Sequence, residues 1–442
     1  MGGPGAGGIP AAGGLRPVAG APVDARSREL YERARRVLVG GVNSPVRAMR
    51  GIGRDPLFID RAEGAYVWDA DGNRYVDFLS TWGPAITGHA DPMVIDDVRE
   101  ALSRGTSYGA PTEREVLFAE AVTEAMPSIE RLRMTSSGSE AVMGAVRLAR
   151  AATGREAIVK AEGGYHGAID GLLAQAGSGA TTLGVPTSPG VTAGATAATR
   201  LVPYNDLAAA EAALEGAAAI IIEPIAGNMG VVPPAPGYLE GLRAACDRTG
   251  ALLILDEVIT GFRVARGGAQ ELYGVRADLT CLGKVIGGGL PVGAFGGRAD
   301  VMAELAPEGP CYQAGTLSGN PLATTAGLAV LCRLAEPGIY ERLDEGGARL
   351  QQVIEDSGAP VTINRIGSML TPFFTDAAVT DYAGATSCDT DMYAAVARGL
   401  LARGVYPPPS QFEAWFVGTR HGDEEFAQLA TALAGALEEA GA

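Results

Sequence analysis

The stretch LGKVIGGGLPVGAFGG, residues 282–297, contains a single charged residue, Lys284. Its neighbours are apolar residues and glycines, and no carboxylate stands close to it in the sequence. Because burying an unpaired ammonium group is costly, we expect this lysine to have a lowered pKa or to lose its charge. A neutral amine is a nucleophile that forms imines with carbonyl compounds. The alternative is a lysine with a buried stem and a head group that reaches water.

Two predicted strand ends carry polar residues where α/β proteins bind ligands. Asp256 ends the apolar strand LLILDEV, and TSSGSE (135–140) lies between a predicted strand and a predicted helix. An acid beyond the carboxyl end of a strand could pair with a protonated ring nitrogen or with a metal ion. Backbone N–H groups at a helix N-terminus could bind phosphate. The alternatives are a solvated acid and a serine that only caps its helix.

Two further motifs could contact the same ligand. EGGYHGA (162–168) contains Tyr165 and His166, and an aromatic ring in this place can stack on a planar ligand, although a core tyrosine is equally common. GTLSGNPL (315–322) is a second loop of small residues, with the hydroxyls of Thr316 and Ser318 available to a phosphate group.

These motifs together suit a phosphorylated aromatic aldehyde. Lys284 would form the imine, Asp256 would keep the ring nitrogen protonated and Tyr165 would stack on the ring. The helix N-terminus would hold the phosphate group. The sequence therefore predicts a site for pyridoxal 5′-phosphate, which acts as an electron sink for carbanions.

Composition and charge restrict the partners of the chain. It has 442 residues, of which 47% are hydrophobic, and a net charge of -16. Nucleic acids and anionic membranes bind basic surfaces, so we expect neither as a partner. The three histidines are too widely spaced to suggest a metal site, and we predict none. No apolar run approaches the roughly 18 residues of a transmembrane helix.

The cysteines and the N-terminal segment indicate the compartment. The five cysteines are scattered and form no C-x-x-C pair, which favours free thiols in a reducing compartment. Residues 1–24 are rich in Gly, Pro and Ala and lack the basic start and apolar core of a secretory signal. We expect a disordered tail over 1–24 and a cytoplasmic protein.

The order of apolar strands and helical patterns predicts an α/β fold. Apolar strand candidates at 157–161, 218–224 and 251–258 alternate with helical patterns, which implies a mostly parallel central sheet covered by helices. YVWDADGNRYVDFL reads as a β-hairpin. We predict that 25–80 joins a smaller α+β domain with 326–442, and that 81–325 forms the large cofactor-binding domain.

The chain resembles the class III aminotransferases, which are pyridoxal-phosphate-dependent transferases of fold type I. The likeness extends from about Ser27 to the C-terminal helix. It is carried by GGVNSPVRA, STWGPAITGHA, YHGAIDGLLAQAGSG, EPIAGN, LDEVITGFR, LGKVIGGGLPVGA, YQAGTLSGNPL and PSQFEAWF.

The resemblance implies roles for residues around the cofactor. Lys284 would be the Schiff-base lysine and would shuttle protons between substrate carbons. The other residues implied to contact the cofactor are Asp256 at the ring nitrogen, Val258 and Tyr165 on the ring faces, Asn228 near the ring oxygen, Gly138 and Ser139 at the phosphate, and Thr316 at the phosphate from the neighbouring subunit. The resemblance thus implies a homodimer with shared active sites.

A second group of residues is implied to bind the substrate. Ser44 and Arg47 match positions that hold a substrate carboxylate, which an arginine fork suits bidentately, and Trp82 would form a wall of the pocket. Ser178 would lie on a mobile lid over about 170–196. Glu413 matches an acid near the substrate amino groups, although without the resemblance it would be interpreted as a surface acid.

Within the family, TGFR after DEV matches an aminomutase branch, whose members move an amino group within one molecule. The resemblance implies conversion of glutamate-1-semialdehyde into 5-aminolevulinate through the two cofactor forms and 4,5-diaminovalerate, in tetrapyrrole (porphyrin) biosynthesis, with glutamyl-tRNA reductase upstream. The alternatives are an intermolecular aminotransferase acting on a β- or ω-amino acid, a racemase, and a non-catalytic binding protein. SSGSE, Ala168 and Gln175 depart from the usual pattern, and the last two could alter the lid.

Overall fold

The computed structural model describes residues 23–174 and 188–441, and its largest element is a seven-stranded sheet. The order of its strands is β4-β10-β9-β8-β7-β5-β6. Strands β6, β5, β7, β8 and β9 are parallel, whereas β10 runs antiparallel to both of its neighbours. The strands are Arg131–Thr135 (β4), Ile158–Ala161 (β5), Thr199–Val202 (β6), Ala219–Ile222 (β7), Leu252–Asp256 (β8), Leu279–Leu282 (β9) and Gly293–Gly297 (β10).

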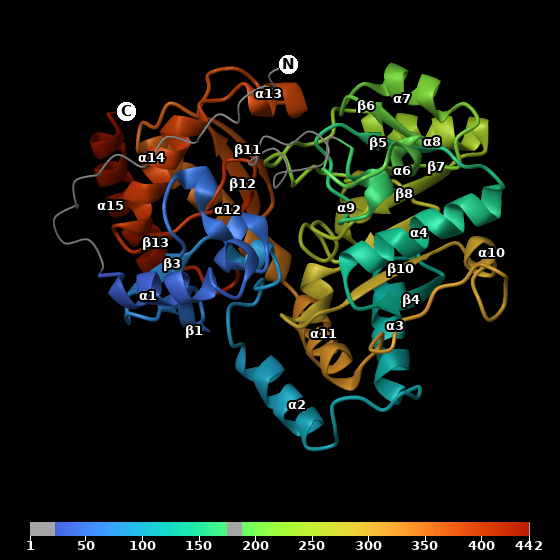
Figure 1. The fold of residues 1–442 in the computed structure, drawn as a ribbon, viewed down its shortest axis with the longest axis horizontal. Coiled ribbons are helices and arrows are strands. Elements are labelled where there is room, and N and C mark those ends of the chain that lie inside the picture. Colours follow the sequence, from blue (N-terminus) through green and yellow to red (C-terminus); the bar gives the residue numbers. More distant parts are fainter. Residues whose placement is uncertain (1–22, 175–187, 442) are drawn as a thin grey trace, which may run out of the picture.

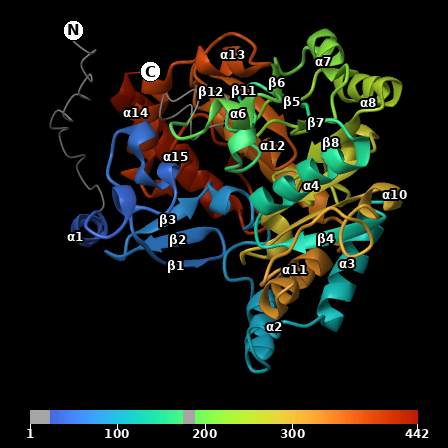
Figure 2. The same ribbon diagram turned by 45° about the vertical axis from the view of Figure 1, so that its right-hand side comes forward.

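Helices cover both faces of this sheet, as Figures 1 and 2 show. Strand β8 illustrates why, because its first four residues are apolar on both sides of the strand and all five of its residues are buried. Ile254 packs with the face covered by α4, whereas Leu253 and Leu255 pack with the face covered by α7 and α8. These helices are Gly138–Thr153 (α4), Leu207–Leu214 (α7) and Tyr238–Thr249 (α8).

A second group of elements joins both ends of the chain. The predicted hairpin forms β2 and β3, and β3 pairs in parallel with β13 from the C-terminal segment. The strands are Ile59–Glu63 (β1), Tyr66–Asp69 (β2), Arg74–Asp77 (β3) and Val405–Tyr406 (β13) in one sheet, and Thr362–Ile366 (β11), Met369–Phe373 (β12) and Trp415–Phe416 (β14) in another. The helices packed here are Ala25–Ala34 (α1), Ile339–Asp356 (α12), Thr390–Leu401 (α14) and Asp423–Ala440 (α15).

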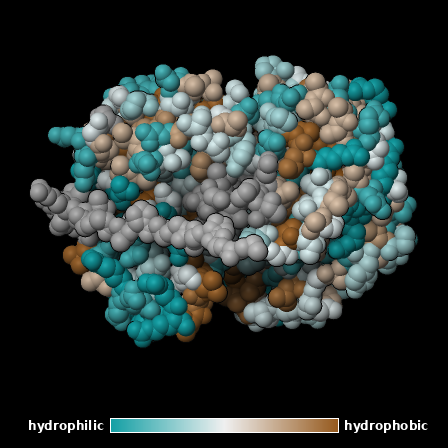
Figure 3. Space-filling view, turned by 45° about the horizontal axis from the view of Figure 1, so that its top comes forward, coloured by the Kyte–Doolittle hydropathy of each residue, from teal (hydrophilic) through white to brown (hydrophobic). Residues whose placement is uncertain are grey.

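The remaining helices connect or border these two groups. They are Pro92–Leu102 (α2), Glu113–Ala125 (α3), Ala193–Thr196 (α6), Gly268–Tyr273 (α9), Ala299–Met302 (α10), Pro321–Leu334 (α11) and Tyr382–Thr386 (α13). In the described ranges no single helix is long and apolar enough to cross a membrane, although α11 and α12 pass that test as a pair bent by 83°. On the face shown in Figure 3, hydrophilic residues are interspersed with scattered hydrophobic ones.

The predicted fold class is confirmed. The large sheet is mostly parallel and helix-covered, and the N- and C-terminal segments share a smaller α+β unit. The boundaries at residues 80 and 325 stay predictions. Most of the predicted tail at 1–24 lies outside the described residues.

Candidate active site

A cavity opens beyond the carboxyl ends of β5, β7 and β8, beside the N-terminus of α4. It brings together seven of the eight residues predicted to bind the cofactor. Its lining consists of Gly138, Ser139, Val142, Tyr165, His166, Gly167, Glu223, Asn228, Asp256, Val258, Ile259 and Lys284. Ligands of open α/β sheets bind at this edge because strand-end loops and helix N-termini converge there. The cavity is therefore the candidate active site.

Lys284 is the second residue after β9 and begins a short 3₁₀ turn, Lys284–Gly287. Its φ of 49° lies in the left-handed region, where residues other than glycine are uncommon. Burial lowers the pKa of its amine, while the charges of Asp256, Glu223 and Glu413 act in the opposite direction. Part of the residue remains accessible from the cavity. The lowered pKa increases the fraction of neutral, nucleophilic amine, as expected from the apolar sequence around it.

Asp256 forms a buried pair with His166, which the sequence analysis named without giving it a role. The Asp256 Oδ2 and His166 Nδ1 atoms are 2.7 Å apart, and Oδ1 accepts a hydrogen bond from Val258 N at 3.1 Å. Because a carboxylate can only accept, the Nδ1 atom carries the proton of this bond. His166 Nε2 is buried and has no hydrogen-bond partner in the described part of the chain. The pair orients the carboxylate toward the cavity.

Glu223 is a second buried carboxylate at the site, and the sequence analysis missed it. Its Oε2 atom accepts hydrogen bonds from Gly227 N and Asn228 Nδ2, both at 2.9 Å, and its Oε1 atom accepts one from Tyr165 N at 3.1 Å. Burial raises the pKa of its carboxyl group. Glu223 thus orients two residues predicted to contact the cofactor. The sequence did contain a signal for this residue, because Glu223 comes at the end of an apolar strand, as Asp256 does.

The N-terminus of α4 is built to accept an anion. The Ser137 hydroxyl caps the helix by accepting a bond from Glu140 N at 3.2 Å. Gly138 and Ser139 occupy the first two helical positions, whose N–H groups have no intrahelical partner. A Cβ atom on Gly138 would come within 3.0 Å of the Val258 side chain, so glycine permits this close approach. Such a helix N-terminus suits an anion, and binding of a phosphate group here stays a prediction.

Three of the residues predicted to bind substrate lie close together in the neighbourhood of Lys284. A Cβ atom added to Gly83 would lie 3.9 Å from Lys284 Cδ. The preceding residue, Trp82, has the Arg47 guanidinium carbon 5.8 Å from its ring centroid. Ser44 precedes the short 3₁₀ turn Pro45–Ala48 that contains Arg47. Arg47 is exposed and Trp82 is half-buried, so both can be reached by a substrate.

Glu413 is only 6% exposed, and its charge acts on the Lys284 amine. The interpretation of Glu413 as a surface acid is therefore wrong, because the segment before β14 folds inward. Thr316 is exposed and does not line this cavity within its own chain. Ser178, Gln175 and much of the predicted lid lie outside the described residues, whereas Ala168 is described and exposed.

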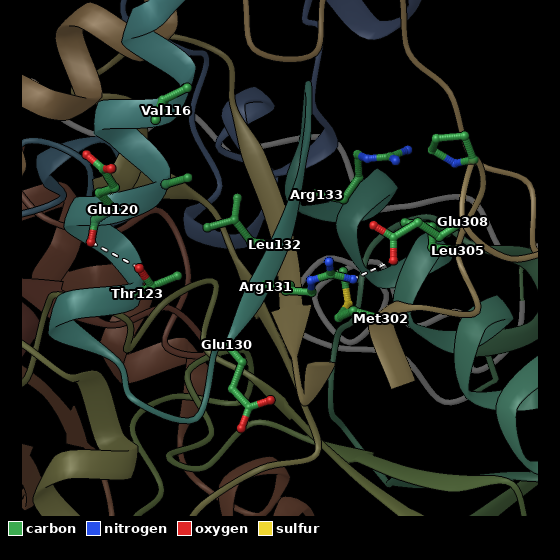
Figure 4. Close-up of a pocket in the computed structure, with 12 residues that line it drawn as sticks. Val116, Glu120, Thr123, Glu130, Arg131, Leu132, Arg133, Met302, Leu305 and Glu308 are labelled. Carbon is green, nitrogen blue, oxygen red and sulfur yellow. Dashed lines mark hydrogen bonds and ion pairs between the residues drawn. The ribbon is translucent and has the colours of Figure 1, made fainter. Parts of the chain in front are cut away.

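A larger cavity, of about 410 Å³, lies away from Lys284, between α3, β4 and the segment after α10. Figure 4 shows the ion pair across it, in which Arg131 Nη1 and Glu308 Oε2 are 2.6 Å apart. The residues that line this cavity include no lysine, cysteine or histidine. The larger cavity therefore has no side chain that could form an imine, despite its size. The smaller cavity contains Lys284 together with the acids Glu223 and Asp256.

The fold and the site agree with the comparisons to known proteins. The family model of class III aminotransferases matches residues 49–433, and the chain belongs to this family. A curated relative from Pelotomaculum thermopropionicum, named glutamate-1-semialdehyde 2,1-aminomutase, is 57% identical over 424 residues, which are 94% of this chain and 98% of the relative.

Solved structures show the same similarity at the level of the fold. An ω-transaminase from Sphaerobacter thermophilus matches with a TM-score of 0.87 and 33% identity, over 95% of this chain and 99% of its own. A glutamate-1-semialdehyde aminomutase from Pseudomonas aeruginosa, solved in complex with PMP, matches with a TM-score of 0.82 and 29% identity, over 94% of each chain. The predicted fold type I architecture is thus confirmed.

Proposed function

We propose that this chain is an aminomutase that converts glutamate-1-semialdehyde into 5-aminolevulinate by moving an amino group within one molecule. The observation that carries the proposal is the series of neighbouring residues Lys284, Gly83, Trp82 and Arg47, which brings an amine of lowered pKa and an arginine suited to a carboxylate to one region. The curated relative at 57% identity bears the name of this activity. The product would enter tetrapyrrole biosynthesis.

The residues at the site fit pyridoxal 5′-phosphate and its amine form as the cofactor. The free N–H groups of Gly138 and Ser139 suit the phosphate group, and the carboxylate of Asp256 suits a protonated ring nitrogen. Val258 and Tyr165 supply apolar and aromatic surface, and Asn228, held by Glu223, would face the ring oxygen. When bound, this cofactor supplies an electron sink and carries the amino group.

The chain's own residues would then bind the substrate and move its protons. Arg47 and Ser44 would hold the substrate carboxylate, with Trp82 as the adjoining wall. The Lys284 amine, with its lowered pKa, would take a proton from one substrate carbon and return it to the next. Glu413, buried near Lys284, would attract the substrate amino groups.

The proposal also includes a second subunit that contributes to the site. Thr316 is exposed on a loop with Tyr312 and Leu317, which are 72% and 51% exposed. Such exposed apolar side chains suit a subunit interface, and we assign Thr316 to the phosphate site of the partner in a homodimer. Glutamyl-tRNA reductase would deliver the aldehyde substrate. The five free cysteines suit a cytoplasmic location.

One assay separates this proposal from intermolecular transamination, which the similarity to an ω-transaminase makes the second candidate. Purified, dialysed protein is incubated with glutamate-1-semialdehyde alone, and 5-aminolevulinate is measured. Formation of many equivalents per site without an added amino donor or acceptor supports the aminomutase. Turnover that requires both an amine and a 2-oxo acid would instead move the function to transamination.

A further inference from the structure

The turn that carries Trp82 has an unusual backbone. Ser80, Thr81 and Trp82 have φ angles of 46°, 58° and 61°, and Gly83 follows with a φ of 116°. Residues with side chains rarely adopt such angles, and a run of three persists only where the surroundings hold it. The groups that hold this turn therefore determine where Trp82 lies.

The first residues of the turn are held by Asp77. Its Oδ1 atom accepts hydrogen bonds from Leu79 N at 2.9 Å and Ser80 N at 3.1 Å. Its Oδ2 atom is 2.7 Å from His89 Nε2, which fixes the carboxylate in this orientation. These bonds fix the beginning of the turn, and Trp82 N and Gly83 N donate to the carbonyl oxygens of Leu79 at 2.9 Å and Ser80 at 3.0 Å. The carbonyl oxygen at the end of the turn, that of Gly83, is bound by a group from another segment.

That group is Arg263, at the end of the TGFR motif. Its Nη2 atom donates a hydrogen bond to the carbonyl oxygen of Gly83. Its Nη1 atom donates to Ser368 Oγ at 3.2 Å and to the carbonyl oxygen of Val417 at 3.1 Å. The guanidinium carbon also lies 5.3 Å from the ring centroid of Phe416. One side chain thus joins three segments that are far apart in the sequence.

The cost of placing this group is high. Arg263 is 1% exposed, and no carboxylate of the described residues is among the groups that act on its charge. Burial lowers its pKa to about 9. A neutral residue would fill the same space without this cost, so the arginine serves to orient the acceptors it binds.

We infer that Arg263 is a positioning residue for the substrate pocket, because it anchors the end of the Ser80–Gly83 turn and with it the position of Trp82. A Cβ atom added to Gly83 would lie 3.9 Å from the Lys284 stem, and the Arg47 guanidinium carbon lies 5.8 Å from the Trp82 ring centroid. Displacing the turn would move the pocket wall and the carboxylate-binding arginine together. Among the described residues, Arg263 donates hydrogen bonds to Gly83, Ser368 and Val417, none of which lines the cofactor cavity. The inference rests on the proposed function for the identity of the substrate.

The test compares Arg263→Gln, Arg263→Lys and Arg155→Gln in the holoenzyme. Arg155 is the matched control, since it also binds two backbone carbonyl groups, those of Ala217 and Thr249 at 3.0 Å, but lies away from the pocket. In Arg263→Gln we expect KM for glutamate-1-semialdehyde to rise about tenfold or more, with kcat changing less than about threefold. The cofactor absorption band should remain, and Arg263→Lys should recover part of the KM.

An unchanged KM in Arg263→Gln, or an equal rise in Arg155→Gln, would overturn the inference. So would loss of cofactor binding with KM intact. If Arg263→Gln does not fold, Gly83→Ala decides, because alanine is strained at this φ and should raise KM in the same way. If the wild-type enzyme turns over only with an added amine and a 2-oxo acid, the proposed function is wrong. The KM values of the wild type and the variants are then compared for the amine substrate.

Discussion

His166 Nδ1 and Asp256 Oδ2 lie 2.7 Å apart at the base of the candidate active site, and both side chains are almost fully buried. His166 lies in the segment after β5 and Asp256 is the last residue of the parallel strand β8, 90 positions further along the chain. The bond leaves the carboxylate oriented by two donors, since Val258 N binds its other oxygen. The acid that would face a ring nitrogen is therefore positioned before any ligand binds.

Replacing His166 should weaken catalysis without destroying the fold. A hydrogen bond to a charged group contributes about 1.5–3 kcal/mol, so His166→Ala should lower kcat/KM about ten- to hundredfold. His166→Asn retains an N–H donor near the Nδ1 position and should lose less. Steady-state kinetics of both variants test this. An equal loss of kcat/KM in the two variants would show that the hydrogen bond from His166 to Asp256 does not account for the loss.

Lys284→Ala should abolish turnover and retain cofactor. The lysine supplies the only amine that lines the described cavity, whereas the residues proposed to hold the phosphate group and the ring lie on α4, at the end of β8 and in the segments after β5, β7 and β8. Lys284→Arg keeps the positive charge but not the nucleophile, and should be inactive as well. Product formation and the ultraviolet-visible spectrum are measured together. Turnover near the wild-type rate in either variant would remove the basis of the whole assignment.

Much of the fold was predictable because the central strands carry a strong local signal. Strand β8 is apolar on both faces, and the Asp-Gly-Asn turn marks the hairpin of β2 and β3. The direction of β10 was not predictable, since an apolar strand has the same pattern in either direction. Strands β13 and β14 have two residues each, which is too short to show any alternation.

The sequence could predict those site residues that lie at the end of an apolar strand, as Asp256 does, because ligands of α/β proteins bind there. The partners of such residues were not, because a bond like Asn228 Nδ2 to Glu223 or Arg263 to Gly83 depends on tertiary packing. The burial of Glu413 was missed for the same reason. Local patterns indicate which residues could do chemistry, and the fold determines which of them meet.

Arg47→Ala should weaken substrate binding more than it slows the chemical step. Loss of a charged hydrogen bond of about 1.5–3 kcal/mol should raise KM about ten- to hundredfold. Arg50→Ala is the matched control, since Arg50 is also exposed and lies three residues further along. Initial rates over a range of glutamate-1-semialdehyde concentrations give both constants. A KM that is unchanged, or that rises equally in Arg50→Ala, would place the carboxylate elsewhere.

Lys160 should make the stability of the protein depend on pH above neutrality. Its buried ammonium group donates to the carbonyl oxygens of Gly164 at 2.9 Å, Leu172 at 3.1 Å and Ala174 at 2.9 Å. Burial lowers its pKa from 10.5 to about 8, although the charge of Glu223 opposes the shift. Between these values the unfolded chain binds more protons than the folded one, so the free energy of unfolding contributed by this group rises with pH.

The shift from 10.5 to about 8 corresponds to roughly 3 kcal/mol gained between pH 8 and 10.5. Lys160→Met removes the titrating group, so the wild type should gain about this much relative to the variant over the same range. Urea unfolding of both proteins at pH 7.5, 9 and 10.5 measures the difference, in which the titration of all other groups cancels. Parallel pH profiles would mean that the ammonium group titrates as it does in the unfolded chain, and that its three carbonyl contacts offset the cost of burial.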